Sequence, residues 1–279
     1  MAESPIEPRL DQVLEFCARD PVERVFLEDM ARRGYGRFLG VPDGDGTLAS
    51  LCHLGVNLVP SGRGCGAFAR AASGVGSRMI IGEEGAVSDL WRDAAPLLAQ
   101  PRADRPGQPV YAIWEPPEGG ASGLRAADLA DLEALVPVCA ASHALELGVD
   151  PLLHDGESFR WRTRVQITDG RSWVWFDPAG VVLFKAEVSA WTPTAAQVQQ
   201  VWVDPAVRGR GYGSRGLRDL CRLLLAEVPC VTLFVRTDNL AAIALYESIG
   251  ARLSVRTNSV THGTSASRSR QRSRSPREP

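Results

Sequence analysis

Alternation of apolar and polar residues predicts both helices and strands in the first hundred residues. In residues 12–34, Val25, Phe26, Leu27 and Met30 recur at helical spacing, and Gly34 provides a stop, which predicts an amphipathic helix. Two apolar runs flank the sequence DGDG at 43–46 and predict a β-hairpin. Residues 77–98 then predict a strand, a turn and a helix.

A Pro- and Gly-rich stretch over residues 100–123 interrupts this pattern around a short apolar strand at 110–114. Such composition is typical of a junction between domains. We therefore expect a first domain over 1–115, a second over 121–256, and a polar, low-complexity and disordered Arg/Ser-rich tail over 257–279.

The second half has a clear order of elements. A strongly helical run follows Asp128, which is a good N-cap, and a second helix is predicted near 156–167. Residues 172–203 predict three strands, the first two joined by the turn DPAG at 177–180. A glycine-rich loop, a helix, a strand and a last helix complete the pattern.

Composition restricts the class of protein. The chain has 279 residues, is 44% hydrophobic and has a net charge of −2, so we expect a globular core and no strong attraction to nucleic acid or membrane. No apolar run is long enough to span a bilayer. The six cysteines form no CxxC pair and lie mostly in apolar runs, which favours buried free thiols and a cytoplasmic protein without a metal site.

The most informative segment is VDPAVRGRGYGSRG, residues 203–216. GYGSRG matches the dinucleotide pattern GxGxxG, and Asp238 follows at a suitable distance. The preceding strands, however, form an antiparallel pattern, and five residues separate Val203 from Gly209. Glycines that expose successive amides before a helix also suit a diphosphate, and we favour that interpretation.

At this point the sequence resembles the GNAT-type N-acetyltransferases. Arg208, Gly211 and Gly213 fill that family's acetyl-CoA motif, Gln/Arg-x-x-Gly-x-Gly/Ala, and NLAAIALYESIGARL is similar to a second family signature, with Ala251 in place of the usual phenylalanine. The resemblance implies an α/β (α+β) fold with a mixed, mostly antiparallel sheet flanked by helices. The first domain more loosely resembles a degenerate GNAT-like half, as in some bacterial tandem proteins.

The resemblance also implies the site. Acetyl-CoA would be the co-substrate, Tyr246 the general acid and Glu187 the base, although Glu187 and Lys185 on one strand face could equally be a solvated charge pair. Asn239 is a helix N-cap first and a cofactor contact by resemblance. The implied cofactor-binding residues are Val201, Trp202, Val203, Arg208, Gly209, Arg210, Gly211, Tyr212, Gly213, Ser214 and Asn239.

The expected function is transfer of an acetyl group from acetyl-CoA to a small-molecule or peptide amine by direct attack. A non-catalytic acyl-CoA sensor or scaffold is the alternative. The first domain would be a partner surface or substrate wall, because PSGRGCGAF at 60–68 has glycines without a following helix pattern.

The C-terminus departs from the family pattern. RLSVRTNSV begins where a final strand is expected, but it continues into the Arg/Ser-rich tail. We therefore expect the last strand to be missing or shortened, which would leave a sheet edge suited to pairing in a homodimer. No aromatic residue interleaves the tail arginines, so no nucleic-acid partner is expected.

Overall fold

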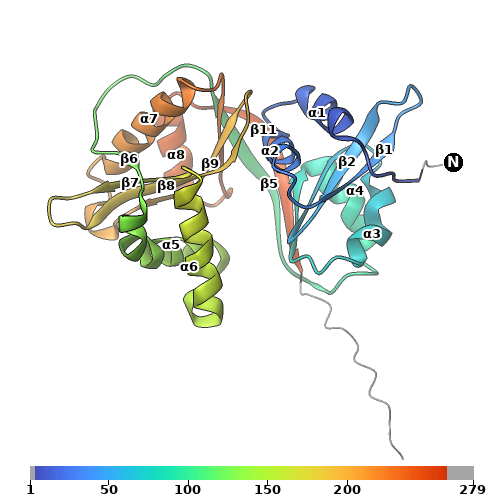
Figure 1. The fold of residues 1–279 in the computed structure, drawn as a ribbon, viewed down its shortest axis with the longest axis horizontal. Helices are drawn as coiled ribbons and strands as arrows, with labels where there is room; N and C mark the ends of the chain where they lie inside the picture. The colour runs from blue at the N-terminus through green and yellow to red at the C-terminus, as the bar shows by residue number, and fades with distance from the viewer. Residues whose placement is uncertain (1–3, 263–279) are drawn as a thin grey trace, which may run out of the picture.

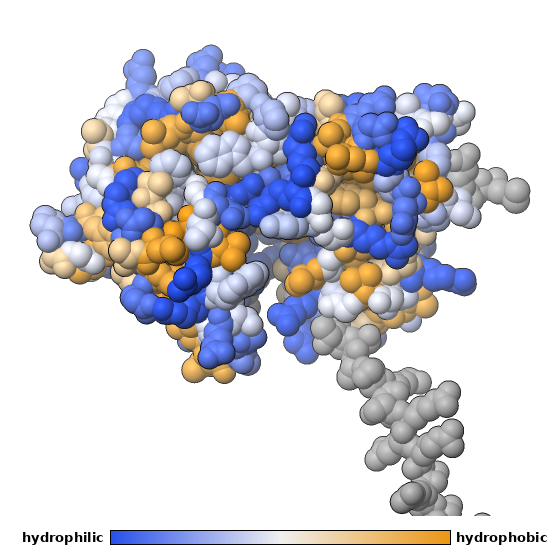
Figure 2. All heavy atoms as spheres, in the orientation of Figure 1, coloured by the Kyte–Doolittle hydropathy of each residue, from blue (hydrophilic) through white to orange (hydrophobic). Residues whose placement is uncertain are grey.

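A computed structural model describes residues 4–262 of the chain. One 11-stranded sheet runs through the molecule in the order β1-β2-β3-β4-β11-β5-β10-β9-β8-β7-β6. Figure 1 shows two lobes built on it, one blue to cyan and one green to orange, with β5 and β11 between them. Figure 2 shows a notch that separates the lobes at the lower edge of the same view.

The N-terminal lobe contains a three-stranded meander covered by helices. Its hairpin β1–β2 confirms the prediction made from the DGDG turn, with Leu39 opposite Cys52. The elements of this lobe, with the long strand that leaves it, are α1 (Leu10–Ala18), α2 (Val25–Arg32), β1 (Arg37–Pro42), β2 (Leu48–Leu54), β3 (Asn57–Gly62), η1 (Cys65–Phe68), α3 (Ala69–Ser73), β4 (Met79–Glu83), α4 (Glu84–Ala94) and β5 (Pro101–Ile113).

The C-terminal lobe follows the order expected from the sequence. The strands β7, β8 and β9 form the predicted antiparallel meander, and the Asp128 side chain caps η2 by accepting from the Ala130 amide. The elements are β6 (Arg125–Ala126), η2 (Leu129–Asp131), α5 (Leu132–Leu147), α6 (Leu152–Thr168), β7 (Ser172–Phe176), β8 (Val182–Trp191), β9 (Ala196–Val203), η3 (Pro205–Val207), α7 (Tyr212–Leu225), β10 (Val231–Phe234), α8 (Leu240–Ser248) and β11 (Arg252–His262).

The expectation of a missing or shortened last strand was wrong. Strand β11 extends to His262 and pairs with β4 on one side and β5 on the other, so it lies inside the sheet. Its polar side chains are buried because β5 satisfies them: Asn258 accepts from the Gly107 amide at 2.7 Å, and Gln108 donates to Ser259 at 2.8 Å. Because these buried residues are polar, the alternation of apolar and polar residues did not predict this part of β11. The rest of the predicted tail, 263–279, lies outside the described residues.

Strand β5 is longer than the short strand expected at 110–114. Only Val110–Ile113 pairs with β10, so within residues 4–262 the Pro-rich first part has β11 on one side and no strand on the other. Proline is tolerated on such an open edge because its missing N–H is not needed there. Gly107, at φ 63°, permits the local irregularity.

Helices cover both faces of the sheet in the C-terminal lobe, as Figure 1 shows. Phe184, Ala186 and Val188 of β8 belong to the core under α7 and α8. The opposite face packs against α5 and α6 through residues such as Phe159 and Trp202. Gly216 of α7 lies directly on Phe184, since a Cβ there would stand 2.7 Å from the ring.

A buried ion pair joins the two lobes. Asp29 on α2 accepts two hydrogen bonds from Arg171, at 2.7 and 2.9 Å, and the two side chains are only 3% and 9% exposed. Replacing Asp29 with alanine would leave the guanidinium buried without its anion. We expect Asp29→Ala to lower the free energy of unfolding by about 3–5 kcal/mol, measured by urea denaturation.

The exposed pair Arg9–Asp11 is the control, since its side chains are 72% and 68% exposed. Asp11→Ala should change the free energy of unfolding little. Equal effects of the two substitutions would show that the Asp29–Arg171 pair does not hold the lobes together.

Candidate active site

The candidate site lies where β9 and β10 diverge. These two strands are parallel and pair only at Val231 with Ala196, Thr232 with Gln197 and Leu233 with Val198. Beyond Val198 no pairing joins them, so the remainder of β9 presents its edge to the space between the strands. The start of α7 lies beside this end of β9, since Val203 Cγ2 is 3.2 Å from the Cβ position of Gly213.

A bulge in β9 coincides with this divergence. Gln199 lies opposite Glu187 and Trp202 opposite Lys185, so two residues of β9 face one residue of β8. One of them, Gln200, has a φ of 51° and is the only non-glycine residue with positive φ among the described residues. A bulge removes amides from the strand ladder and turns them elsewhere.

The loop between β9 and α7 exposes a set of backbone donors. Gly209 and Gly211 have φ of 75° and 78°, and Gly211 is the N-cap of the 14-residue helix α7. Such conformations are accessible to glycine without a steric cost. In the described part of the chain, five of the six amides from Gly209 to Ser214 donate to no protein acceptor, those of Gly209, Gly211, Tyr212, Gly213 and Ser214, while the Arg210 amide donates to the Val207 carbonyl at 3.3 Å. Unpaired amides at a helix N-terminus are suited to an anion.

Two side chains of the loop form hydrogen bonds to backbone carbonyls at its two ends. Arg208 donates to the Val203 carbonyl at 3.2 Å, and the Ser214 hydroxyl donates to the Gly211 carbonyl at 3.1 Å. The Tyr212 ring lies 4.9 Å from that of Trp175. Arg208, Gly209 and Arg210 are exposed.

The three strand residues predicted as cofactor contacts, Val201 to Val203, differ in their surroundings. The Trp202 side chain packs in the core beneath α5 and α6, so that residue can offer a ligand only its backbone. Val203 lies against the loop, since its Cγ2 would stand 3.2 Å from a Cβ on Gly213. The Asn239 side chain accepts from the Ala242 amide at 3.2 Å, which confirms its predicted role as a helix N-cap.

Tyr246 lies on α8 and is 4% exposed, within the core under α7. Its ring makes an edge contact with Tyr111, with centroids 6.0 Å apart. Burial raises the pKa of the Tyr246 phenol, and the neighbouring Glu146 and Cys221 add to the effect. The phenol therefore stays protonated at neutral pH, as a proton donor must.

Glu187 is one member of a buried ion pair. Lys185 donates to it at 2.8 Å and has a fully buried side chain, while that of Glu187 is 13% exposed. Cys139 of α5 donates its thiol proton to the same carboxylate oxygen at 3.4 Å. The two residues share a strand face and form a charge pair, as the sequence analysis considered. The expectation that this face is exposed to solvent was wrong, because α5 and α6 cover it.

The sequence analysis missed a second carboxylate beside the bulge. Glu146, near the end of α5, accepts a hydrogen bond from the side-chain amide of Gln200. Burial raises the pKa of the Glu146 carboxyl above its usual value. The two adjacent glutamines in AQVQQVWV, which break the strand alternation, were a signal for this bulge.

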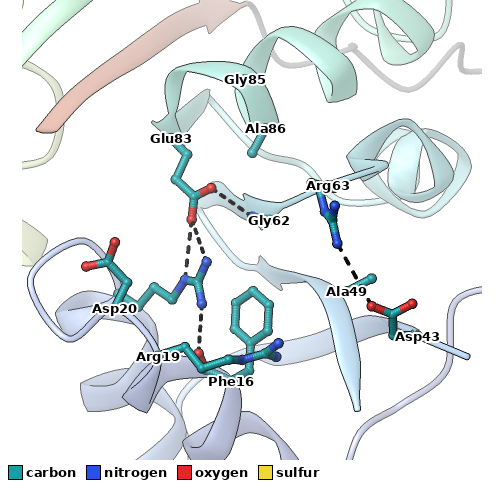
Figure 3. A pocket seen from close by; sticks show the side chains of 11 residues that line it. Phe16, Arg19, Asp20, Asp43, Ala49, Gly62, Arg63, Glu83, Gly85 and Ala86 are labelled. Atoms are coloured by element: carbon teal, nitrogen blue, oxygen red, sulfur yellow. Dashed lines mark hydrogen bonds and ion pairs between the residues drawn. The ribbon is translucent and has the colours of Figure 1, made fainter. Parts of the chain in front are cut away.

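The N-terminal lobe has an equivalent divergence, between β3 and β4, which pair only at Asn57 with Met79 and Leu58 with Ile80. Here Glu83 bridges the two strands by accepting from the Gly62 amide at 2.9 Å and pairing with Arg24 at 3.4 Å. Figure 3 shows this carboxylate pointing to Gly62 across the pocket, whose volume is about 460 Å³.

One expectation about this lobe was wrong. The segment PSGRGCGAF ends in the 3-10 helix η1 and is followed directly by the short helix α3. The buried residues Cys65, Phe68, Ala69 and Ala72 have helical spacing, which the sequence analysis overlooked in so short a run. The amide of Gly62, the third residue of this segment, already donates to Glu83, unlike the amides at the start of α7.

Known proteins support the class of fold. The profile described as the acetyltransferase (GNAT) family matches residues 144–251, and a domain of unknown function (DUF4081) matches residues 36–135. Of the solved structures, a GNAT acetyltransferase from Colwellia psychrerythraea aligns with a TM-score of 0.58 at 12% identity, covering 93% of this chain and 98% of that one. A tandem GNAT protein from the clavulanic acid biosynthesis pathway aligns with a TM-score of 0.55 at 15% identity, covering 95% and 98%.

Sequence relatives agree. A protein named mycothiol acetyltransferase from Mycolicibacterium vanbaalenii is 30% identical over 275 residues, covering 88% of this chain and 84% of that protein. Another of that name, from Mycobacterium sp. strain JLS, is 35% identical over 126 residues, and the match spans 42% of its length. The chain belongs to the GNAT acetyltransferase family, and two GNAT-like halves make up its fold.

Two further observations concern membrane-spanning helices and metal sites in the described residues. In residues 4–262 no helix combines the length and apolarity needed to cross a bilayer. The same residues contain no group of three or more His, Cys, Asp or Glu side chains placed to hold a metal ion.

Proposed function

We propose that the C-terminal lobe binds acetyl-CoA and transfers its acetyl group to a primary amine. The observation that supports this most is the set of five amides without protein acceptors, those of Gly209, Gly211, Tyr212, Gly213 and Ser214. A diphosphate at this position would accept from them and lie at the positive end of α7. Arg208 and Arg210 flank the same loop and add positive charge.

The acetyl thioester would then extend between β9 and β10. A backbone N–H at Val201–Val203, on the part of β9 that no longer pairs with β10, would stabilise the oxyanion that forms when the amine attacks the carbonyl carbon. The C–N bond forms and the C–S bond breaks. Tyr246 gives its proton to the departing CoA sulfur and recovers one from the solution. Of the two protons that the ammonium group of the acceptor loses, one thus ends on sulfur and one in solvent.

A carboxylate near the bulge would accept the proton of the incoming amine. Glu187, expected from the sequence, and Glu146, added by the structure, are the two candidates. Both approach from the α5–α6 face of the sheet. Tyr246 approaches from the face covered by α7 and α8.

The acceptor would be a small-molecule or peptide amine. We assign residues 121–256 to the catalytic domain and residues 1–115 to a second domain that acts as a substrate wall. The closure of its own strand divergence by Glu83 supports a non-catalytic role for that domain. Relatives named as acetyltransferases favour an enzyme over an acyl-CoA sensor. They also make the acceptor used by mycothiol acetyltransferases the first to test.

The experiment is an acetyl-transfer assay on the full chain. The protein is mixed with acetyl-CoA and, separately, with the mycothiol acetyltransferase acceptor, glucosamine, spermidine and amino acid amides. Mass spectrometry should find one N-acetylated amine, with CoA released in equal amount. Acetyl-CoA binding without transfer to any amine would contradict the enzyme proposal and favour the sensor.

A further inference from the structure

We infer that Glu146, rather than Glu187, accepts the proton of the amine and that Gln200 positions its carboxylate. This inference rests on the proposed acetyl transfer. Gln200 occupies the bulge where β9 leaves β10, and its side-chain amide donates to Glu146 Oε2. The hydrogen bond therefore places the carboxylate beside the backbone that would bind the acetyl oxygen.

Glu187 is poorly suited to accept a proton. Its oxygen Oε1 is already bound by the Lys185 ammonium and the Cys139 thiol. Because the Lys185 side chain is fully buried, protonating Glu187 would leave an ammonium group without its anion inside the protein. Glu187 thus has a structural task, the neutralisation of Lys185.

Glu146 has no such task. Among the described residues its carboxylate accepts from the neutral amide of Gln200 and forms no ion pair. Protonation of Glu146 therefore leaves no cation unpaired. Its backbone carbonyl, by contrast, is fixed by Arg105 of β5 at 3.0 Å and by Arg236 at 3.5 Å. These two contacts hold the end of α5 against the sheet.

The electrostatic surroundings raise the pKa of the Glu146 carboxyl and so make its carboxylate a stronger base than an ordinary glutamate. Burial is the largest influence and raises the pKa of Glu146, and Glu187 raises it further, while three cations oppose the rise, Lys185, Arg105 and Arg236. Tyr246 of α8 is close enough to interact with it electrostatically, since the Glu146 carboxylate raises the pKa of the Tyr246 phenol. A carboxyl with a raised pKa takes a proton from an ammonium group more readily than an ordinary glutamate does.

The test is the pH dependence of kcat/KM for wild type and Glu146→Gln, with acetyl-CoA and an amine accepted by the wild type. Glutamine keeps the size of the side chain and an oxygen for Gln200, but it accepts no proton. We expect wild-type activity to rise with pH through a pKa above the ordinary ~4.3 of glutamate. The variant should lose this acidic limb and about 10²–10⁴-fold in kcat, with unchanged acetyl-CoA affinity.

Three further variants separate chemistry from folding. Glu146→Asp should retain an acidic limb at reduced rate, because a carboxylate remains. Glu187→Gln should lower the melting temperature and keep the acidic limb. Glu227→Gln, an exposed glutamate after α7, should resemble wild type in both.

An active wild type whose acidic limb survives in Glu146→Gln and disappears in Glu187→Gln would overturn the assignment of Glu146. A wild type that neither binds acetyl-CoA nor acetylates any amine would instead overturn the proposed function.

Discussion

Replacing Gly211 with valine should weaken acetyl-CoA binding about a hundredfold or more. Gly211 has a φ of 78°, and the region around its Cβ position is open, with only Ser214 Oγ at 3.9 Å. A branched side chain there disturbs the backbone that presents the amides and occupies space needed by the diphosphate. Loss of two hydrogen bonds to a charged group, at about 1.5 kcal/mol each, corresponds to about a hundredfold in affinity. Isothermal calorimetry measures this directly.

Gly180 provides a matched control. It lies in the turn between β7 and β8 with a φ of 84°, and no atom of the described residues stands within 4 Å of its Cβ position. Gly180→Val therefore imposes a similar backbone strain without approaching the loop, and it should bind acetyl-CoA as wild type does. Gly213→Val, whose Cβ would stand 3.2 Å from Val203, should resemble Gly211→Val. Equal affinity in all three variants would mean that the loop does not hold the diphosphate.

Replacing Tyr246 with phenylalanine should lower kcat by about 10²–10⁴-fold and leave the affinity for acetyl-CoA unchanged. The substitution removes only the phenol oxygen, so the edge contact with Tyr111 is preserved. Burial raises the pKa of Tyr246 above its ordinary value near ~10, so the group remains a proton donor across the neutral range. Its loss should therefore reduce activity at every pH from 6 to 9, by steady-state kinetics.

Tyr111→Phe is the control for this substitution. Tyr111 belongs to the same aromatic pair, and its hydroxyl donates to Glu247 at 2.9 Å. Removal of this hydroxyl should affect stability by about 1 kcal/mol and leave kcat near that of wild type. If Tyr246→Phe retains full turnover, Tyr246 is a packing residue only.

Local chemistry made much of the fold predictable. Asp128 and Asn239 each cap a helical turn as their positions indicated. The glycines of the loop and the antiparallel strands before it were sufficient to distinguish this architecture from a dinucleotide-binding fold. All six cysteines are buried and free, as expected from their apolar surroundings.

The length of β11 depends on tertiary pairing, which the local sequence pattern did not predict. Thr257, Asn258 and Ser259 are polar, yet they lie in an interior strand because β5 supplies their hydrogen-bond partners. The pairing residues are about 150 positions apart in the chain, as for Gly107 with Asn258. Local alternation contains no information about such a partner, so the length of β11 was underestimated.

The same limit applies to the site. A glycine-rich loop can be recognised from the sequence by its composition. The contact between Glu146 and Gln200 cannot, because it forms only when α5 packs on the sheet. Lys185 and Glu187 were correctly placed on one face by alternation. That this face is buried under α5 and α6 follows from packing, which alternation does not encode.

The most direct test compares two ligands of the unmodified protein by calorimetry. Acetyl-CoA and S-acetylpantetheine share the acetyl thioester, but the second lacks the diphosphate and the nucleotide. If the amides of Gly209 and Gly211–Ser214 bind a diphosphate, acetyl-CoA should bind and S-acetylpantetheine should bind at least about a hundredfold more weakly. Equal affinities, or no heat with millimolar acetyl-CoA, would contradict a diphosphate site at the start of α7.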